Sequence, residues 1–268
     1  MNLHWEPEGP ARGRLVLLHG VMSTAATWWR MGPALAAGGW RVDALDLPAH
    51  GAWPRSTRPL DLDTLVDGIA GQLSEPVDLL VGHSLGAVVA VTLAARRPES
   101  ARALVLEDPP GSTGGDRAAF AAGIAADARL VRADREQLVR RERDANPTWA
   151  PEDVEHSVDG IAAADAPAIV AGFHGELRWD LPATLATLQA PVLVLAARHP
   201  DRSALQGPAR DAVRSYLPPD RFVLLDGGHC LHRDLPDRWL AIVAGFADVA
   251  LAAALPGRGD TGHHRRPR

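Results

Sequence analysis

The residue with the clearest capacity for chemistry is Ser84, in the stretch GHSLG at residues 82–86. An aliphatic run precedes this stretch and an alanine-rich run follows it, which predicts a strand, a sharp turn and a helix. On such a turn the serine side chain is exposed, while side chains two residues to either side would collide. Gly82 and Gly86 are the residue types that this geometry requires. We therefore interpret Ser84 as a nucleophile rather than as a polar residue of a structural turn.

A nucleophilic serine needs a base, and the stretch LLDGGHCLHRDLP offers two histidines. His229 follows a glycine pair that ends a predicted strand, where a loop can carry it to Ser84. His232 lies three residues further on, so on a helix the two histidines would share one face, as a pair of metal ligands does. The stretch has no cysteine or carboxylate cluster with ligand spacing. We assign the base to His229, expect structural contacts for His232, and predict no metal site.

The third requirement is a carboxylate that orients the base. It is expected between the serine and the histidine in the chain, just beyond the predicted strand PVLVLAA at 191–197. Asp201 is the only carboxylate near that place, about one residue later than expected. Glu107 and Asp108 end the preceding predicted strand, and either could orient His229 from there. We assign the acid to Asp201 and keep Glu107 and Asp108 as alternatives.

Two backbone N–H groups are expected to bind the oxyanion that forms when a serine attacks a carbonyl group. Leu85 follows the nucleophile and supplies the first N–H group. The second is expected from Val21, in the loop after the predicted strand at 14–20. Met22 would line the same pocket. Trp149, much further along the chain, is expected to form part of the pocket wall.

Short aliphatic runs recur along the chain and alternate with helical patterns. This alternation predicts an α/β fold with a mostly parallel central sheet and helices on both faces. Such strands read as continuous apolar runs because both of their faces are buried. The predicted strands lie at 14–20, 41–48, 77–83, 102–109, 191–197 and 221–228.

Residues 111–180 interrupt this alternation, because they contain no strand signal. A Gly- and Ser-rich linker opens the block, and a charged helix is predicted to follow it, up to about residue 145. We predict an all-helical cap inserted into the sheet domain. The expected division is therefore a first core part at 1–110, the cap at 111–180, a second core part at 181–255 and a disordered tail at 256–268.

These features together resemble the α/β-hydrolase family over about residues 13–110 and 185–250. The order serine, acid, histidine along the chain is the order of that family. The resemblance implies that Ser84 and His229 are catalytic and that the helical block is the family's cap, but Asp201 departs from the family pattern. The stretches that carry the resemblance are His19-Gly20, DLPAHG (46–51), GHSLG (82–86), LEDPP (106–110) and GGHCLHRD (227–234).

Composition excludes several classes of protein. The chain has 268 residues, enough for a sizeable core, and its single cysteine, Cys230, excludes an intramolecular disulfide. The formal charge is −5 with no basic stripe, so nucleic acid is not an expected partner. No apolar stretch approaches the length of a membrane span, and the N-terminus lacks the apolar region of a signal peptide. We expect a cytoplasmic protein with no membrane partner.

The resulting expectation is a serine hydrolase that cleaves an ester, lactone or thioester of a small apolar substrate through an acyl-enzyme, without any cofactor. Two alternatives stay open. The same residues could serve a carbon–carbon bond hydrolase, lyase or cyclase, in which His229 moves protons and Ser84 is not acylated. The displaced acid, Asp201, also leaves room for a non-catalytic binder of small ligands on the same scaffold.

Overall fold

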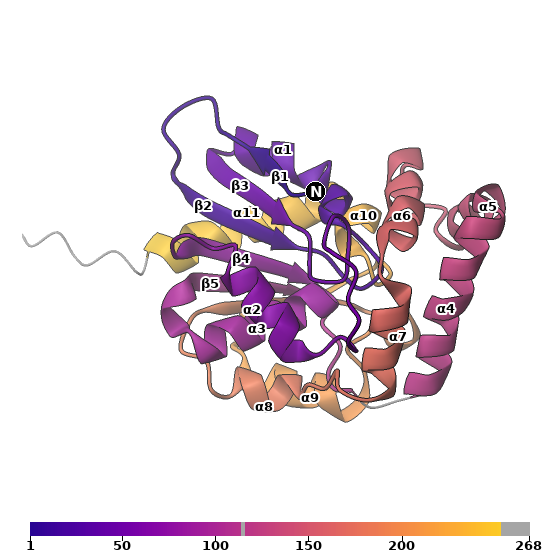
Figure 1. Cartoon of the computed structure of the whole chain (residues 1–268). Helices are drawn as coiled ribbons and strands as arrows, with labels where there is room; N and C mark the ends of the chain where they lie inside the picture. The colour runs from indigo at the N-terminus through magenta and orange to yellow at the C-terminus, as the bar shows by residue number, and fades with distance from the viewer. Residues whose placement is uncertain (114–115, 253–268) are drawn as a thin grey trace, which may run out of the picture.

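A single sheet organises the protein. In the computed structural model, which describes residues 1–113 and 116–252, seven strands form this sheet in the order β1-β3-β2-β4-β5-β6-β7 (Figure 1). The short β1 (Leu3–Trp5) pairs antiparallel with β3, and all other neighbouring strands are parallel. The predicted mostly parallel α/β fold is therefore confirmed. The parallel strands are β2 (Gly13–Leu18), β3 (Trp40–Leu45), β4 (Val77–His83), β5 (Ala101–Glu107), β6 (Val192–Ala197) and β7 (Phe222–Leu225).

Both faces of the sheet are covered by helices, which explains why the strands are aliphatic along their whole length. In β2, Leu15 and Leu17 belong to the core on one face, while Val16 and Leu18 belong to the core on the other. This is the two-residue alternation of a strand. The first face is covered by α1 (Met31–Ala37) and α11 (Pro236–Ala252), and the second by α2 (Leu62–Ala70), α3 (Leu85–Arg96), α8 (Leu181–Leu185) and α9 (Gly207–Tyr216).

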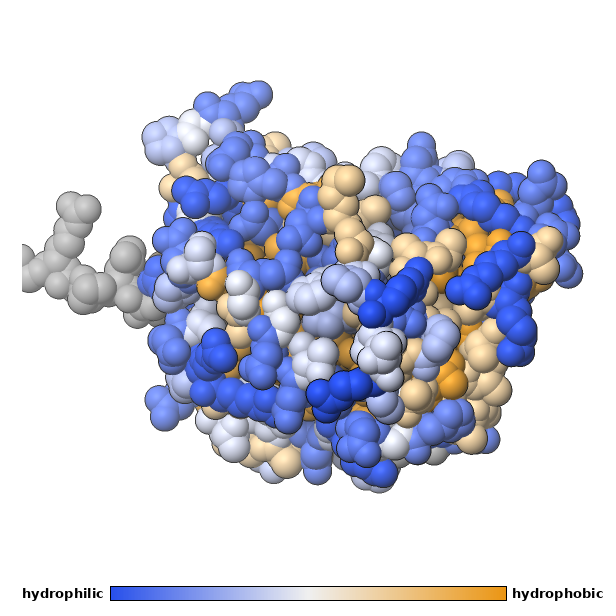
Figure 2. All heavy atoms as spheres, in the orientation of Figure 1, coloured by the Kyte–Doolittle hydropathy of each residue, from blue (hydrophilic) through white to orange (hydrophobic). Residues whose placement is uncertain are grey.

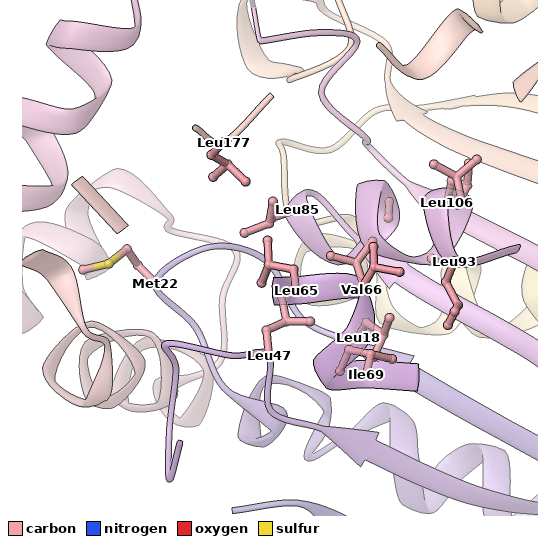
Figure 3. Packing of buried hydrophobic residues seen from close by; sticks show 14 of the residues in the cluster. Leu18, Met22, Leu47, Leu65, Val66, Ile69, Leu85, Leu93, Leu106 and Leu177 are labelled. Carbon is pink, nitrogen blue, oxygen red and sulfur yellow. The ribbon is translucent and has the colours of Figure 1, made fainter. Parts of the chain in front are cut away.

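The core on the second face extends from the sheet to the helices beyond it. Figure 3 shows Leu18 from β2 beside Val66 and Ile69 from α2, with Leu93 from α3 nearby. Met22 lies apart from these side chains, in the loop that follows β2 (Figure 3). Every residue of α3 from Leu85 to Ala94 is buried, so this helix is enclosed on all sides.

A helical insertion, residues 117–174, lies beyond the carboxyl ends of the strands (Figure 1). The single charged helix expected here is two helices in the structure. They separate at Asp134, whose carboxylate accepts the N–H of Gln137 and so caps the second helix. The helices of the insertion are α4 (Arg117–Ala133), α5 (Arg135–Ala145), α6 (Pro151–Ala163) and α7 (Ala166–His174).

The insertion carries an apolar surface. Apolar side chains gather in Figure 2 on the side of the molecule where α4 and α7 lie. On α4, Phe120 is exposed, and its ring centre lies 4.9 Å from that of Phe173 on α7. The domain boundaries at 110/111 and 180/181 stay predictions. The tail predicted to be disordered, 256–268, lies outside the described residues, and no helix within the described part could span a membrane.

Candidate active site

Ser84 stands on the sharp turn between β4 and α3. Its backbone has φ 52° and ψ −118°, a conformation that residues with side chains rarely adopt. The turn is held in place because the Ser84 N–H group donates to the Glu107 carbonyl oxygen, at 2.9 Å. A side chain on either neighbouring glycine would be blocked: a Cβ atom at Gly82 would lie 2.4 Å from the backbone of Gly86, and one at Gly86 would lie 2.5 Å from the Leu18 carbonyl oxygen.

His229 and Ser84 line the same cavity, which has a volume of about 830 Å³. His229 follows β7, as expected, and its Nδ1 lies 2.6 Å from Oδ2 of Asp108. When Nδ1–H donates to this carboxylate, Nε2 is left unprotonated and able to accept a proton. Asp108 is fully buried, whereas the His229 side chain is partly exposed to the cavity.

The carboxylate that contacts His229 is that of Asp108 and not that of Asp201, to which the sequence analysis assigned the acid. Asp201 lies in a short 3-10 helix, Pro200–Arg202, and is exposed. Among the described residues, no hydrogen bond or ion pair joins it to His229. The physical reason is that β5 and β6 are parallel neighbours, with Glu107 opposite Leu195. Their carboxyl ends meet at one edge of the sheet, so a carboxylate after either strand can reach the histidine.

The acid was expected in the loop after β6. This loop instead donates hydrogen bonds that fix the carboxylate of Asp108 in place. Asp108 has φ 42°, and its N–H group donates to the Leu195 carbonyl oxygen at 2.6 Å. Three donors from residues 197–204 point at its carboxylate, so both oxygens are fixed before the contact with His229 is counted. These donors are the N–H of Ala197 at 3.1 Å, the hydroxyl of Ser203 at 2.5 Å and the N–H of Ala204 at 2.8 Å.

The two N–H groups expected to bind an oxyanion are available. Within the described residues, the N–H groups of Val21 and Leu85 donate to no acceptor, and both residues line the cavity. Val21 is brought close to Ser84 because Gly20 packs against the turn that carries Ser84. A Cβ atom at Gly20 would lie 3.1 Å from Cβ of Ser84. Met22, which has φ 58°, and Trp149 also line the cavity, where the sequence analysis placed them.

Two buried histidines hold the loop that carries Val21. His19 donates from Nδ1 to the Gly20 carbonyl oxygen at 2.7 Å and accepts the Leu47 N–H at Nε2, 3.0 Å away. His50 accepts the Met22 N–H at its Nε2, 3.1 Å away. Burial lowers the pKa of His19 to about 3 and that of His50 to about 4, so both rings are neutral at ordinary pH.

A second buried network lies beneath the site and engages the other histidine. Glu107 accepts hydrogen bonds from Nδ1 of His232 at 2.8 Å and from the indole of Trp239 at 2.9 Å. Nε2 of His232 lies 3.0 Å from the hydroxyl of Thr27, so the neutral ring accepts from that hydroxyl. Burial lowers the pKa of His232 well below its usual value. His229 and His232 thus contact different carboxylates and are not arranged as a pair of metal ligands.

Two neighbouring tryptophans and the cysteine near the site have structural explanations. Trp28 is fully buried, and Trp29 donates from its indole to Asp153 on α6 at 2.9 Å. Cys230 borders the cavity, but burial raises the pKa of its thiol to about 12, so it is not a competing nucleophile. The donors around Asp108 could not be recognised in the sequence, because serine and backbone N–H groups in a loop carry no distinctive pattern.

Residues 15–242 match the model of the alpha/beta hydrolase family. The chain therefore belongs to this family.

Two relatives show the range of activities near this chain. It is 32% identical over 216 residues to a putative carbamate hydrolase, RutD, of Variovorax paradoxus, an alignment that covers 74% of this chain and 78% of the relative. It is 43% identical over 93 residues to the pimeloyl-acyl-carrier-protein methyl ester esterase of Neisseria meningitidis serogroup B, strain H44/76. That alignment spans about a third of both chains, 35% of each.

Solved structures agree on the fold. The enol-lactonase of Burkholderia xenovorans LB400 superposes with a TM-score of 0.73 at 19% identity, covering 92% of this chain and 96% of the lactonase. At this identity the likeness concerns the fold alone.

Proposed function

We propose that the protein is a serine hydrolase that cleaves esters or thioesters through an acyl-enzyme. The observation that carries this proposal is the meeting of three features at one cavity. Ser84 lies on a strained turn, His229 lines the same space, and Nδ1 of His229 is bound by the buried Asp108. These are the nucleophile, base and orienting acid that acyl transfer requires.

In the proposed reaction, Ser84 Oγ forms a bond to the carbonyl carbon while its proton passes to Nε2 of His229. The oxyanion is bound by the N–H groups of Val21 and Leu85. The bond from carbon to the leaving oxygen or sulfur then breaks, and His229 returns the proton to the leaving group. Water next attacks the acyl-enzyme and gives a proton to His229, and this proton regenerates the Ser84 hydroxyl as the acid is released.

The cavity favours an acyl group with apolar parts. Met22, Ile161, Phe173 and Trp179 contribute apolar surface to its wall. The names of the relatives support esters and carbamates as the first compounds to assay. Asp201 lies about one residue later than the acid was expected, and this was the reason to consider a non-catalytic binder. The contact between Asp108 and His229 removes that reason.

A fluorophosphonate probe tests the proposal, because it labels only an activated serine. We expect labelling of the wild-type protein and none of Ser84→Ala. Ser203→Ala is unsuitable as a control because its hydroxyl contacts Asp108, so Ser215→Ala, on α9 and outside the cavity, serves as the matched control and should label normally. Absence of labelling on folded wild-type protein would overturn the proposal.

A panel of methyl esters, thioesters, lactones and carbamates then ranks the substrate classes.

A further inference from the structure

Arg233 is a buried cation in the wall of the cavity that contains Ser84. It lies on the short helix α10 (Leu231–Asp234), four residues after His229, and only 5% of its surface is exposed. It lines the same cavity as the proposed nucleophile and base. The mechanism proposed above gives this guanidinium no task.

The contacts of Arg233 leave one edge of its guanidinium group free. Nε and Nη2 both donate to the hydroxyl oxygen of Thr27, at 3.1 and 2.7 Å. The guanidinium carbon lies 4.4 Å from the ring centre of Trp149, so the cation stacks on the indole. Among the described residues, Nη1 donates to no acceptor and no carboxylate forms an ion pair with Arg233. The N–H groups along the edge between Nη1 and Nη2 therefore have no protein partner.

The carboxylates near Arg233 are engaged elsewhere. The charges of Asp153 and Asp234 act on the pKa of His232, and those of Glu107, Asp234 and Asp108 act on the pKa of Cys230. Each of these carboxylates accepts hydrogen bonds from other donors, and those of Asp108 are given above. The donors are the Trp29 indole and Ala150 N–H for Asp153, the Trp149 indole, Thr148 hydroxyl and Gly228 N–H for Asp234, and His232 and the Trp239 indole for Glu107. A buried cation without a paired anion is costly, so the site favours an anion from outside the protein.

Two other arginines border the cavity and do not fit this role. Arg117 is occupied, because it donates to three backbone carbonyl oxygens, those of Gly172, Phe173 and Leu177. Arg202 is exposed, so water screens its charge. Arg233 alone of these three combines burial, a free edge and a fixed position on an aromatic ring.

We propose that Arg233 binds a carboxylate of the substrate, so that the protein acts on esters or thioesters that also carry a free carboxylate. The two parallel N–H groups at the free edge match the two oxygens of a carboxylate. This inference rests on the proposed serine hydrolase function, since it assigns the substrate class of the same site. It makes Arg233 a residue that determines specificity rather than one that takes part in the bond changes.

The test compares two chromogenic esters that differ in the terminal group of the acyl chain. p-Nitrophenyl hydrogen glutarate carries a carboxylate, and p-nitrophenyl pentanoate ends in a methyl group. We expect the wild-type protein to have the higher kcat/KM for the glutarate ester. Arg233→Met should lower this value about tenfold to a hundredfold, mainly through KM, and that for the pentanoate ester by less than about threefold. Arg233→Lys should recover part of the loss.

A matched control separates charge recognition from structural damage. Arg221 also stacks on an aromatic ring, 4.7 Å from the centre of Phe246, but it lies outside the cavity. Arg221→Met should leave the ratio of the two kcat/KM values unchanged. An equal loss on both esters in Arg233→Met would overturn the proposal, as would a wild-type protein that does not prefer the charged ester.

A binding measurement keeps this proposal distinct from the proposed hydrolysis. Calorimetry of glutarate with Ser84→Ala should detect binding, which should be lost in Ser84→Ala/Arg233→Met. If the proposed function is wrong, neither ester is hydrolysed and the fluorophosphonate does not react, yet glutarate still binds in an Arg233-dependent manner. If the protein labels with fluorophosphonate but glutarate binding does not depend on Arg233, only the specificity proposal fails.

Discussion

Asp108 joins three segments of the chain that are distant in sequence. It directly follows β5, its carboxylate receives donors from the end of β6 and the loop after it, and it contacts His229 after β7. Each oxygen accepts at least two hydrogen bonds, so the carboxylate cannot rotate away from the histidine without leaving buried donors unpaired. The orientation of the His229 ring, the proposed base, is therefore fixed by the packing of three neighbouring strand ends.

This arrangement predicts opposite results for two similar substitutions. Asp108→Asn should lower kcat for ester hydrolysis by about 10²–10⁴, because an amide no longer fixes the tautomer of His229. Asp201→Asn should change kcat by less than about twofold, since Asp201 is exposed and does not contact His229. Steady-state assays of both variants measure the difference, and thermal unfolding checks that Asp108→Asn folds. A larger loss in Asp201→Asn than in Asp108→Asn would contradict the assignment.

At the residue scale, the sequence was most informative where local geometry demands a residue type. Gly82 and Gly86 could be recognised because no side chain fits at those points of the turn. The acid could not be located in the same way. Any carboxylate at the ends of two adjacent parallel strands can reach His229, and the choice between them depends on loop donors that leave no pattern in the sequence.

At the scale of elements, α6 of the insertion packs directly on the loop that carries Val21. The contact is possible because Gly160 has no side chain: a Cβ atom there would lie 2.8 Å from Cα of Ser23 and 2.9 Å from the Met22 carbonyl oxygen. Both neighbouring atoms belong to the backbone, so they cannot turn aside as a flexible side chain would. The insertion thereby fixes the position of one proposed oxyanion donor.

Gly160→Ala should therefore lower activity without removing any polar group. We expect kcat to fall about tenfold or more, because the loop must shift by several tenths of an ångström and the donor geometry suffers. Gly123→Ala is the matched control, since Gly123 lies on α4 with nothing within 4 Å of its added Cβ atom. That control should keep full activity and gain about 0.5–1 kcal/mol in the free energy of unfolding. Equal kcat values for the two variants would refute this role of α6.

Strands with a clear apolar pattern could be predicted from the sequence, and elements with a weak or misleading pattern could not. All six predicted aliphatic strands are present, because burial on both faces demands apolar residues throughout. The three-residue β1 was missed, since Leu3–Trp5 is too short for a pattern and its pairing with β3 is a tertiary contact. The break at Asp134 was missed because the charged residues around it favour a continuous helix.

At the scale of the whole molecule, several histidines are buried and neutral. Burial lowers the pKa of His19, His50, His83 and His232. The unfolded chain takes up protons at these positions once the pH falls below about 6.5, whereas the folded protein does not. Folding stability is therefore complete above pH 6.5 and is lost as the pH falls towards the folded values. Glu107, whose pKa is raised by burial, changes the stability with pH in the opposite direction, but it is one group against four histidines.

Urea unfolding between pH 7.5 and 5 should reveal this loss. His19 and His50, with pKa values of about 3 and about 4, should each cost about 2 kcal/mol of unfolding free energy at pH 5. His50→Gln should reduce the slope of the unfolding free energy against pH by the amount that corresponds to about one bound proton. His4→Gln should not flatten it, because the hydrogen bond to Asp43 raises the pKa of His4. A free energy of unfolding that stays constant from pH 7.5 to 5 would contradict the prediction.

The position of Asp108 directly after β5 also separates two tasks that one loop could have combined. The segment after β6 contributes backbone and hydroxyl donors to the acid, yet its charged residues Asp201 and Arg202 carry none of the bond-changing chemistry and border the cavity. Substitutions at these two positions can alter which compounds enter without disturbing the reacting groups. In the proposed hydrolase, the groups that react and these two residues at the cavity therefore belong to different segments of the chain.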